Sequence, residues 1–80
     1  MYKNKNGHLN NIAGSKIREL RLNYPEKLSQ KQLADKMQLI GLDLDKNAIQ
    51  RIESGHRFIT DIELKKFATF FAVSTDYLLK

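Results

Sequence analysis

The 80-residue chain contains no cysteine, no tryptophan, one proline and two histidines. Without cysteine it can form neither a disulfide nor a cysteine zinc site, and two histidines are too few for a zinc cage. No thiol nucleophile is available and no Ser-His-Asp spacing stands out, so the sequence predicts neither an enzyme nor a metal or cofactor site. A chain of this length forms one small domain whose stability depends on packing alone.

Long apolar runs are also missing. The longest, at residues 67–73, is interrupted by Thr69 and is too short to span a bilayer. Residues 1–11 contain Lys3 and Lys5 but no apolar stretch, so no secretory signal is predicted. We therefore expect a cytoplasmic protein that has no membrane partner.

The sequence has an excess of positive charge, with 14 Lys and Arg against nine Asp and Glu, or a net charge of +5. Residues 1–27 contain six basic and two acidic side chains, residues 28–60 five and four, and residues 61–80 three and three. The positive field therefore lies on the first two segments. It favours an anionic partner, most often nucleic acid. Charge alone does not exclude the alternative, a basic protein that has no such partner.

Four of the expected helices begin with one local pattern, in which a capping Ser, Asp or Thr has apolar residues one position before it and four positions after it. The caps are Ser29, Asp45, Thr60 and Ser74. Gln32 follows Ser29 by three residues, which completes a capping box. Glu63 stands in the same relation to Thr60. The repeated pattern predicts four helix starts.

Another helix precedes these four. It is expected to start near Asn10 or Asn11 and to stop before Pro25. Gly41 and Gly55 follow the second and third helices, where a residue in the left-handed conformation commonly ends a helix. The expected helices cover residues 11–23, 30–40, 46–54, 61–71 and 75–79. Because no segment alternates like a strand, the predicted fold class is all-α with five helices.

The same periodicity predicts the domain limits and the core. Residues 1–10 are expected to form a flexible basic arm, and residues 11–80 a single domain. The expected core residues are Ile17, Leu20, Leu33, Ala34, Met37, Ile49, Ile52, Leu64, Phe67, Ala68, Phe71, Val73 and Leu78.

The third expected helix has a polar and an apolar face. At about 100° per residue, its polar side chains fall within an arc of about 140°, opposite the apolar ones. The polar set is Lys46, Asn47, Gln50, Arg51 and Ser54. This arc contains no acid, and Arg or Lys pairs with guanine and Asn or Gln with adenine. Two interpretations stay open on this evidence: an ordinary solvated face, or a surface that reads DNA bases.

Four segments occur in an order that is typical of one family. They are IRELR at residues 17–21, LSQKQLADKM at 28–37, NAIQRIESG at 47–55 and AVSTDYLL at 72–79. Together they resemble the Cro and phage-repressor helix-turn-helix family, also called XRE-type. The resemblance implies a compact five-helix, lambda-repressor-like domain whose second and third helices form the helix-turn-helix. It also implies sequence-specific binding of double-stranded DNA by a transcriptional regulator, a repressor of phage, mobile-element or antitoxin type.

The resemblance further implies roles for individual side chains. Its base-reading positions correspond to Lys46, Asn47, Gln50 and Arg51. Phosphate contacts are expected at Gln30, Lys31, Ser54 and Arg57. Main-chain amides of the loop after the third helix would join them, and Gln30 would also brace the recognition helix. The family's buried structural ion pair corresponds to Arg21 and Glu53, whereas His56 is expected to be a solvated loop residue.

The connection between the second and third helices is longer than is usual in the family, which leaves the register of the recognition helix open. Gly41 follows the second helix as a left-handed residue would, and this predicts a Schellman ending in which Leu42 meets Met37. Leu42 and Leu44 would then pack on the core, so that the insertion is an ordered brace. The alternative is a disordered excursion.

A weak homodimer on a pseudo-palindromic operator is expected, because one short recognition helix reads few bases. Candidate contacts are Phe58, Ile59, Phe70 and Tyr77, with Phe70 or Tyr77 favoured as a partly exposed aromatic residue. Two other classes stay open: a protein-interaction module that docks on an acidic partner, and an enzyme, for which the chain has little room. No small-molecule ligand, operator sequence or direction of regulation can be read from the sequence.

Overall fold

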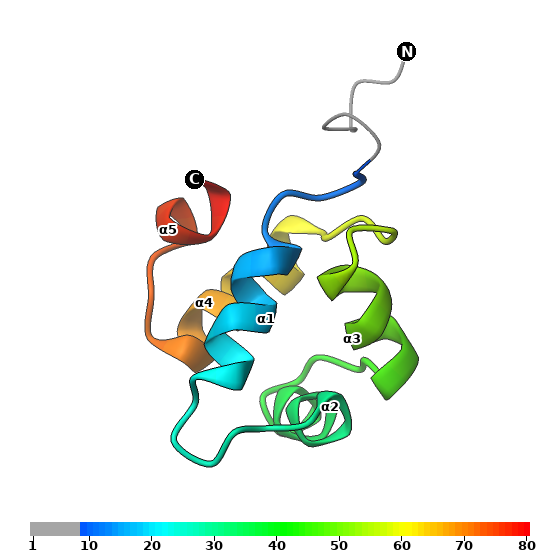
Figure 1. The fold of residues 1–80 in the computed structure, drawn as a ribbon, viewed down its shortest axis with the longest axis vertical. Coiled ribbons are helices and arrows are strands. Elements are labelled where there is room, and N and C mark those ends of the chain that lie inside the picture. Colours follow the sequence, from blue (N-terminus) through cyan, green and yellow to red (C-terminus); the bar gives the residue numbers. More distant parts are fainter. Residues whose placement is uncertain (1–8) are drawn as a thin grey trace.

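Five helices and no β-strand make up residues 9–80, the part of the chain described by the computed structural model. The helices are α1 (Gly14–Leu22), α2 (Gln30–Leu39), α3 (Lys46–Glu53), α4 (Asp61–Phe71) and α5 (Thr75–Leu79). Figure 1 shows α1 at the centre with α4 behind it, α2 and α3 on one side and α5 on the other. The predicted all-α, five-helix fold is confirmed. Within the described range, no helix is both long enough and apolar enough to cross a membrane.

The helix starts depend on the predicted caps. The four caps Ser29, Asp45, Thr60 and Ser74 each accept the backbone N–H three residues later, at distances of 2.8 to 3.2 Å. The side chain of Gln32 accepts the Ser29 N–H, and that of Glu63 accepts the Thr60 N–H, so both capping boxes are closed. The four starts and both boxes are therefore confirmed, and the ends of all five helices agree with prediction to within one residue.

The predicted start of the first helix near Asn10 or Asn11 is wrong, because α1 begins at Gly14. Asn11 still acts as a local cap, since its Oδ1 accepts the Gly14 N–H at 2.7 Å. Residues 10 and 11 do not join the helix because they hydrogen-bond to the end of α3 and to the chain that follows it. Residues 1–8 of the predicted flexible arm lie outside the described residues.

The connection between α2 and α3 begins with the predicted Schellman ending. Gly41 has a φ of +93°, and its N–H donates to the Gln38 carbonyl at 3.1 Å. The Leu42 N–H donates back to the Met37 carbonyl at 2.9 Å. Leu42 and Leu44 are both buried, with exposed fractions of 8% and 4%. The insertion is therefore an ordered brace, and the disordered alternative is excluded.

Two side chains from outside the turn complete this brace. Gln38 Nε2 donates to the Leu44 carbonyl at 3.1 Å, immediately before the Asp45 cap of α3. Lys66 Nζ, from α4, donates to the Ile40 carbonyl at 2.8 Å and so satisfies an acceptor at the end of α2. The start of α3 is thus fixed relative to both α2 and α4.

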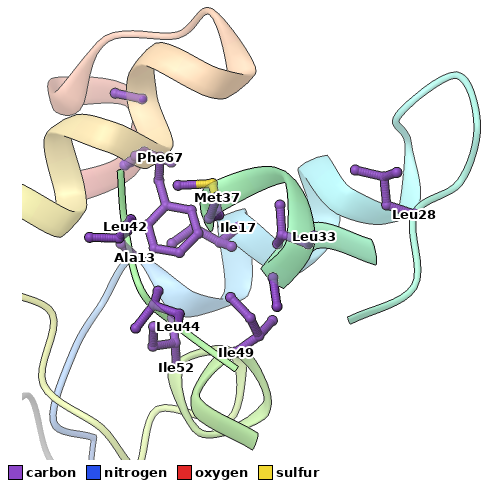
Figure 2. Packing of buried hydrophobic residues seen from close by; sticks show 13 residues of the cluster. Ala13, Ile17, Leu28, Leu33, Met37, Leu42, Leu44, Ile49, Ile52 and Phe67 are labelled. Carbon is purple, nitrogen blue, oxygen red and sulfur yellow. The ribbon is translucent and has the colours of Figure 1, made fainter. Parts of the chain in front are cut away.

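The core lies where α1, α2, α3 and α4 converge around Phe67 (Figure 2). Leu78 of α5 also belongs to it. The buried apolar residues are Ala13, Ile17, Leu28, Leu33, Ala34, Met37, Leu42, Leu44, Ile49, Ile52, Phe67, Ala68 and Leu78. Leu20, Leu64, Phe71 and Val73, which were predicted for the core, are only partly buried but pack against it. The predicted core is therefore largely correct. It lacks Ala13 and Leu28, together with Leu42 and Leu44, whose packing on the core was predicted separately for the insertion.

We expect Gly41→Val to lower the free energy of unfolding by more than about 1 kcal/mol, because a β-branched residue is strained at positive φ. Asp43→Val is the matched control, since Asp43 is exposed in the same connection and its φ is not positive. Thermal unfolding of both variants checks this expectation. A Gly41→Val protein as stable as the Asp43→Val protein would contradict the role of the Schellman ending.

Candidate nucleic-acid interface

The polar face of α3 is open to solvent along its whole length. The side chains of Lys46, Asn47, Gln50 and Arg51 are all exposed. On the opposite side, Ile49 and Ile52 are fully buried, with exposed fractions of 0%. The two faces are therefore divided as predicted, while base reading by the four exposed side chains stays a prediction.

α3 packs directly against α1 and α2. At the closest point, a Cβ atom on Gly14 would lie 2.0 Å from the Ile52 carbonyl oxygen, so only glycine allows this approach of the two backbones. The Gly14 N–H is already held by Asn11. Sequence reasoning missed this role of Gly14, because the approach depends on a residue far along the chain.

The ion pair between Arg21 and Glu53, which the resemblance implied, is present and buried. Arg21 Nε lies 2.6 Å from Glu53 Oε2, and Nη2 donates to Oε1 at 2.9 Å. Arg21 Nη1 also donates to the Leu28 carbonyl at 2.9 Å. This pairing neutralises the one acidic side chain of α3, so the charge on its exposed face stays positive.

The predicted phosphate-contact residues on α2 occupy two different environments. Gln30, partly buried at the first position of α2, donates from Nε2 to Glu53 Oε1 at 3.1 Å and so links the helix to α3. Lys31 is exposed and lies 3.3 Å from Asp35 one turn later. Such an exposed pair contributes little to stability and leaves the ammonium group accessible.

The loop that follows α3 contains the other predicted phosphate residues. Ser54 Oγ donates to the Arg51 carbonyl at 3.2 Å and lies 2.9 Å from His56 Nδ1. The backbone N–H groups of residues 54–57 all donate to carbonyls of α3. The main-chain amides at these four positions therefore already have partners within the protein.

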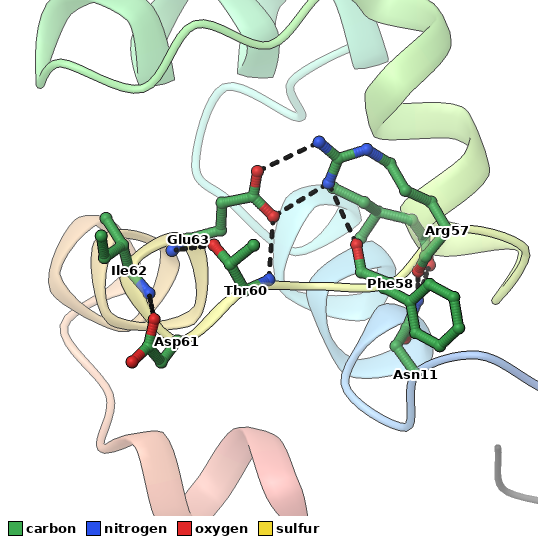
Figure 3. Close-up of polar contacts among 8 residues, drawn as sticks. Asn11, Arg57, Phe58, Thr60, Asp61, Ile62 and Glu63 are labelled. Atoms are coloured by element: carbon green, nitrogen blue, oxygen red, sulfur yellow. Dashed lines mark hydrogen bonds and ion pairs between the residues drawn. The ribbon is translucent and has the colours of Figure 1, made fainter. Parts of the chain in front are cut away.

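Arg57 forms an ion pair with the start of α4 that the sequence did not predict (Figure 3). Its Nη1 and Nη2 donate to the two carboxylate oxygens of Glu63 at 2.9 and 3.1 Å, and Nη1 also reaches the Phe58 carbonyl. The capping box identified Glu63 as a partner of Thr60, but nothing in the sequence indicates that the same carboxylate also binds Arg57. This pair fixes the end of the loop to α4.

Both ionisation equilibria shift toward the charged forms. The hydrogen bond with Glu63 raises the pKa of the Arg57 guanidinium, although burial opposes it. Burial alone would raise the pKa of the Glu63 carboxyl, but hydrogen bonds from Arg57 and from the Thr60 backbone outweigh it and hold the pKa below its ordinary value. The ionised carboxylate is thus the form that the folded protein stabilises.

We expect the stability contributed by the Glu63 charge to be complete above the ordinary carboxyl pKa and to disappear as the pH falls through the lowered one. Glu63→Gln removes the charge but keeps an oxygen for the Thr60 N–H, as Gln32 does at α2. Urea unfolding at neutral pH should find this variant less stable than the parent by about 1 kcal/mol or less, because Arg57 is partly exposed. The difference in stability between parent and variant should disappear on acidification. If it is instead the same at every pH, the Glu63 charge is not its cause.

Two asparagines before α1 form contacts that the sequence also did not reveal. The Asn10 N–H donates to the Gly55 carbonyl at 2.8 Å, and its side chain donates to the His56 carbonyl at 2.7 Å. Asn11 Nδ2 donates to the carbonyls of Ile52 and Arg57 at 3.1 and 2.7 Å. The only signal available in the sequence was the frequency of Asn at helix starts, which reflects local capping and not these distant acceptors.

A groove with a volume of about 580 Å³ lies next to this loop, and its lining is partly polar, with Asn10, Asn11, Thr60 and Asp61. Its apolar lining includes Phe58, Leu79 and Ile12, whose exposed fractions are 49%, 46% and 38%. We call this surface the Phe58 groove. The other predicted dimer contacts differ from Phe58. Ile59 lines the groove but is partly buried. Phe70 stacks on Tyr24, with ring centroids 5.3 Å apart. The fourth candidate, Tyr77, lies outside the groove, with Lys16 Nζ 4.9 Å from its ring centroid.

The sequence model of the Helix-turn-helix family matches residues 17–78, which is more than half of the chain. The matched segment includes all of α2, α3 and α4, together with the Arg21–Glu53 pair. Comparison with curated proteins and with solved structures gave no significant match.

Proposed function

The chain belongs to the helix-turn-helix family of the Cro and phage-repressor type, and from this premise we propose that it is a sequence-specific regulator of transcription. It binds double-stranded DNA in the cytoplasm as a repressor of phage, mobile-element or antitoxin type. The proposal includes no cofactor and no chemical step.

The observation that carries this proposal is the exposed, acid-free face of α3. Among the described residues, the side chains of Lys46, Asn47, Gln50 and Arg51 make no hydrogen bond or ion pair. Their donors and acceptors are therefore free for a ligand, while the buried face and the Arg21–Glu53 pair hold the helix in place. In the proposed complex Arg51 pairs with a guanine, and Asn47 or Gln50 with an adenine.

Phosphate contacts on both sides of α3 would position the helix in the groove. The first turn of α2 has backbone N–H groups without intrahelical partners, and such a helix start attracts phosphate. Gln30 and Lys31 occupy this turn. Beyond α3, Ser54 and Arg57 supply the side chains of the second contact. These groups set the orientation of the domain but do not read sequence.

We expect Arg51→Ala to cost about 1 to 3 kcal/mol at a cognate site and to relax preference at one base pair, because a bidentate base contact is lost. Lys31→Ala is the comparison variant. It should weaken binding equally on all sequences and lower the slope of log affinity against log salt by about one unit. A labelled duplex recovered from a random-sequence pool, titrated beside an unselected duplex at several salt concentrations, measures both effects.

The same titration separates the alternatives. If Arg51→Ala weakens binding equally on selected and unselected duplexes, Arg51 contacts phosphate instead of a base. If selection from the pool recovers no preferred sequence, specific DNA binding is excluded and a basic protein-interaction module becomes the better explanation.

We also propose that two copies form a weak homodimer on a pseudo-palindromic operator, with the Phe58 groove as the contact. Phe58 lies a few residues after the end of α3. A contact between the Phe58 grooves of two copies therefore places their two α3 helices next to each other on one side of the DNA. Half-sites about one helical turn apart fit this arrangement. Phe58 is a better candidate than Phe70, because the ring of Phe70 already stacks on Tyr24.

Phe58→Ala should therefore abolish cooperative binding to paired half-sites while it leaves binding to a single half-site intact. Ile62→Ala is the matched control, because Ile62 is 65% exposed but does not line the Phe58 groove. Footprinting on duplexes with varied half-site spacing reports the cooperativity. Equal cooperativity in the parent and in Phe58→Ala would rule out this contact surface.

A further inference from the structure

Asn10 and Asn11 hold the loop after α3 from outside, in an arrangement that we call the asparagine clasp. Together they donate hydrogen bonds to four carbonyls of this loop and of the end of α3. The acceptors are the carbonyls of Ile52, Gly55, His56 and Arg57, at distances of 2.7 to 3.1 Å. The clasp therefore joins chain segments more than 40 positions apart.

Within the described residues, the carbonyls of residues 55–57 receive hydrogen bonds only from the clasp, whereas the Ile52 carbonyl also accepts the Gly55 N–H at 3.1 Å. The last carbonyls of a helix lack intrahelical partners, and a loop that turns away from the helix leaves further acceptors unpaired. The N–H groups of residues 54–57 all donate to carbonyls of α3, so none of them is left for the carbonyls of residues 55–57. The clasp supplies their hydrogen bonds, and it does so in the loop that presents Ser54, His56 and Arg57.

Asn11 makes the central contacts of the clasp. Its Oδ1 accepts the Gly14 N–H, while its Nδ2 donates to both Ile52 and Arg57. A planar amide has the required acceptor and two donors in one group. Aspartate lacks the donors, and serine is too short to reach both carbonyls.

We infer that Asn11 is a positioning residue for DNA binding, which holds the loop after α3 so that its side chains reach the DNA backbone. This inference rests on the proposed function. Arg57 is held at its carbonyl by Asn11 and at its guanidinium by Glu63. Loss of the first attachment frees the backbone of the loop, so that Glu63 alone holds Arg57 and the side chain no longer has a fixed position relative to the DNA backbone.

Asn11→Ser tests this inference, because serine retains the capping oxygen for the Gly14 N–H but loses both long-range donors. Ser74→Ala is the control. It removes the cap of α5, which packs on α4 on the far side of the molecule from α3 (Figure 1). Because Asn11 and Leu79 of α5 both line the Phe58 groove, both variants are titrated with a single half-site of the selected duplex, below the melting temperature of each. The amide resonances of residues 54–57 are followed by NMR.

We expect Asn11→Ser to weaken binding about tenfold, as the loss of one charge-assisted hydrogen bond would. The salt slope should fall by about one unit, because a phosphate contact is lost. The amide resonances of residues 54–57 should shift, whereas Ser74→Ala should change none of these quantities.

Two results would overturn the inference. If Asn11→Ser binds with the affinity and salt slope of the parent, the clasp is structural only and the proposed function stands. If Ser74→Ala weakens binding as much as Asn11→Ser, the effect reflects general stability. A parent protein that selects no duplex contradicts the proposed function itself, and the positioning role with it.

Discussion

The buried ion pair between Arg21 and Glu53 is the interaction on which the arrangement of the first three helices depends. It lies where α1, the start of α2 and the end of α3 meet, and Gln30 and the Leu28 carbonyl complete its hydrogen bonds. Two charges are tolerated away from water only where the geometry and the surrounding hydrogen bonds are good, and removal of one partner of such a pair costs about 3 to 5 kcal/mol. The orientation of the polar face of α3 is thus tied to α1 and α2.

α3 has only eight residues, so it depends on other elements for its stability. Before it, the Schellman turn, Gln38 and Lys66 order the long connection from α2. After it, Asn11 binds the Arg57 carbonyl and Glu63 binds the Arg57 guanidinium. These contacts are hydrogen bonds, which fix the direction in which α3 faces. The apolar contacts beneath α3 are not directional, so they hold the helix on the core but do not set its rotation about its own axis. Together they leave the exposed face of α3 in one defined position.

Features that depend on neighbours in the chain could be predicted from the sequence. The cap at Ser29, the left-handed Gly41 and the two faces of α3 each involve residues a few positions apart, and helix geometry relates such residues directly. The exposure of Arg51 follows from the same periodicity. Even the long connection between α2 and α3 could be interpreted, because Gly41 and Leu42 carry the local pattern of a Schellman ending.

The amino-acid sequence by itself thus determined the five helices, the caps of four of them and the polar face of α3. Only the tertiary structure decided where α1 begins, what Asn11 binds, which carboxylate holds Arg57 and which aromatic rings are left exposed. Gly14 illustrates the reason, since its closest contact is a carbonyl 38 positions along the chain. The acceptors of a side chain that reaches another element depend on how the helices pack, and that packing is a property of the whole core and not of any short segment.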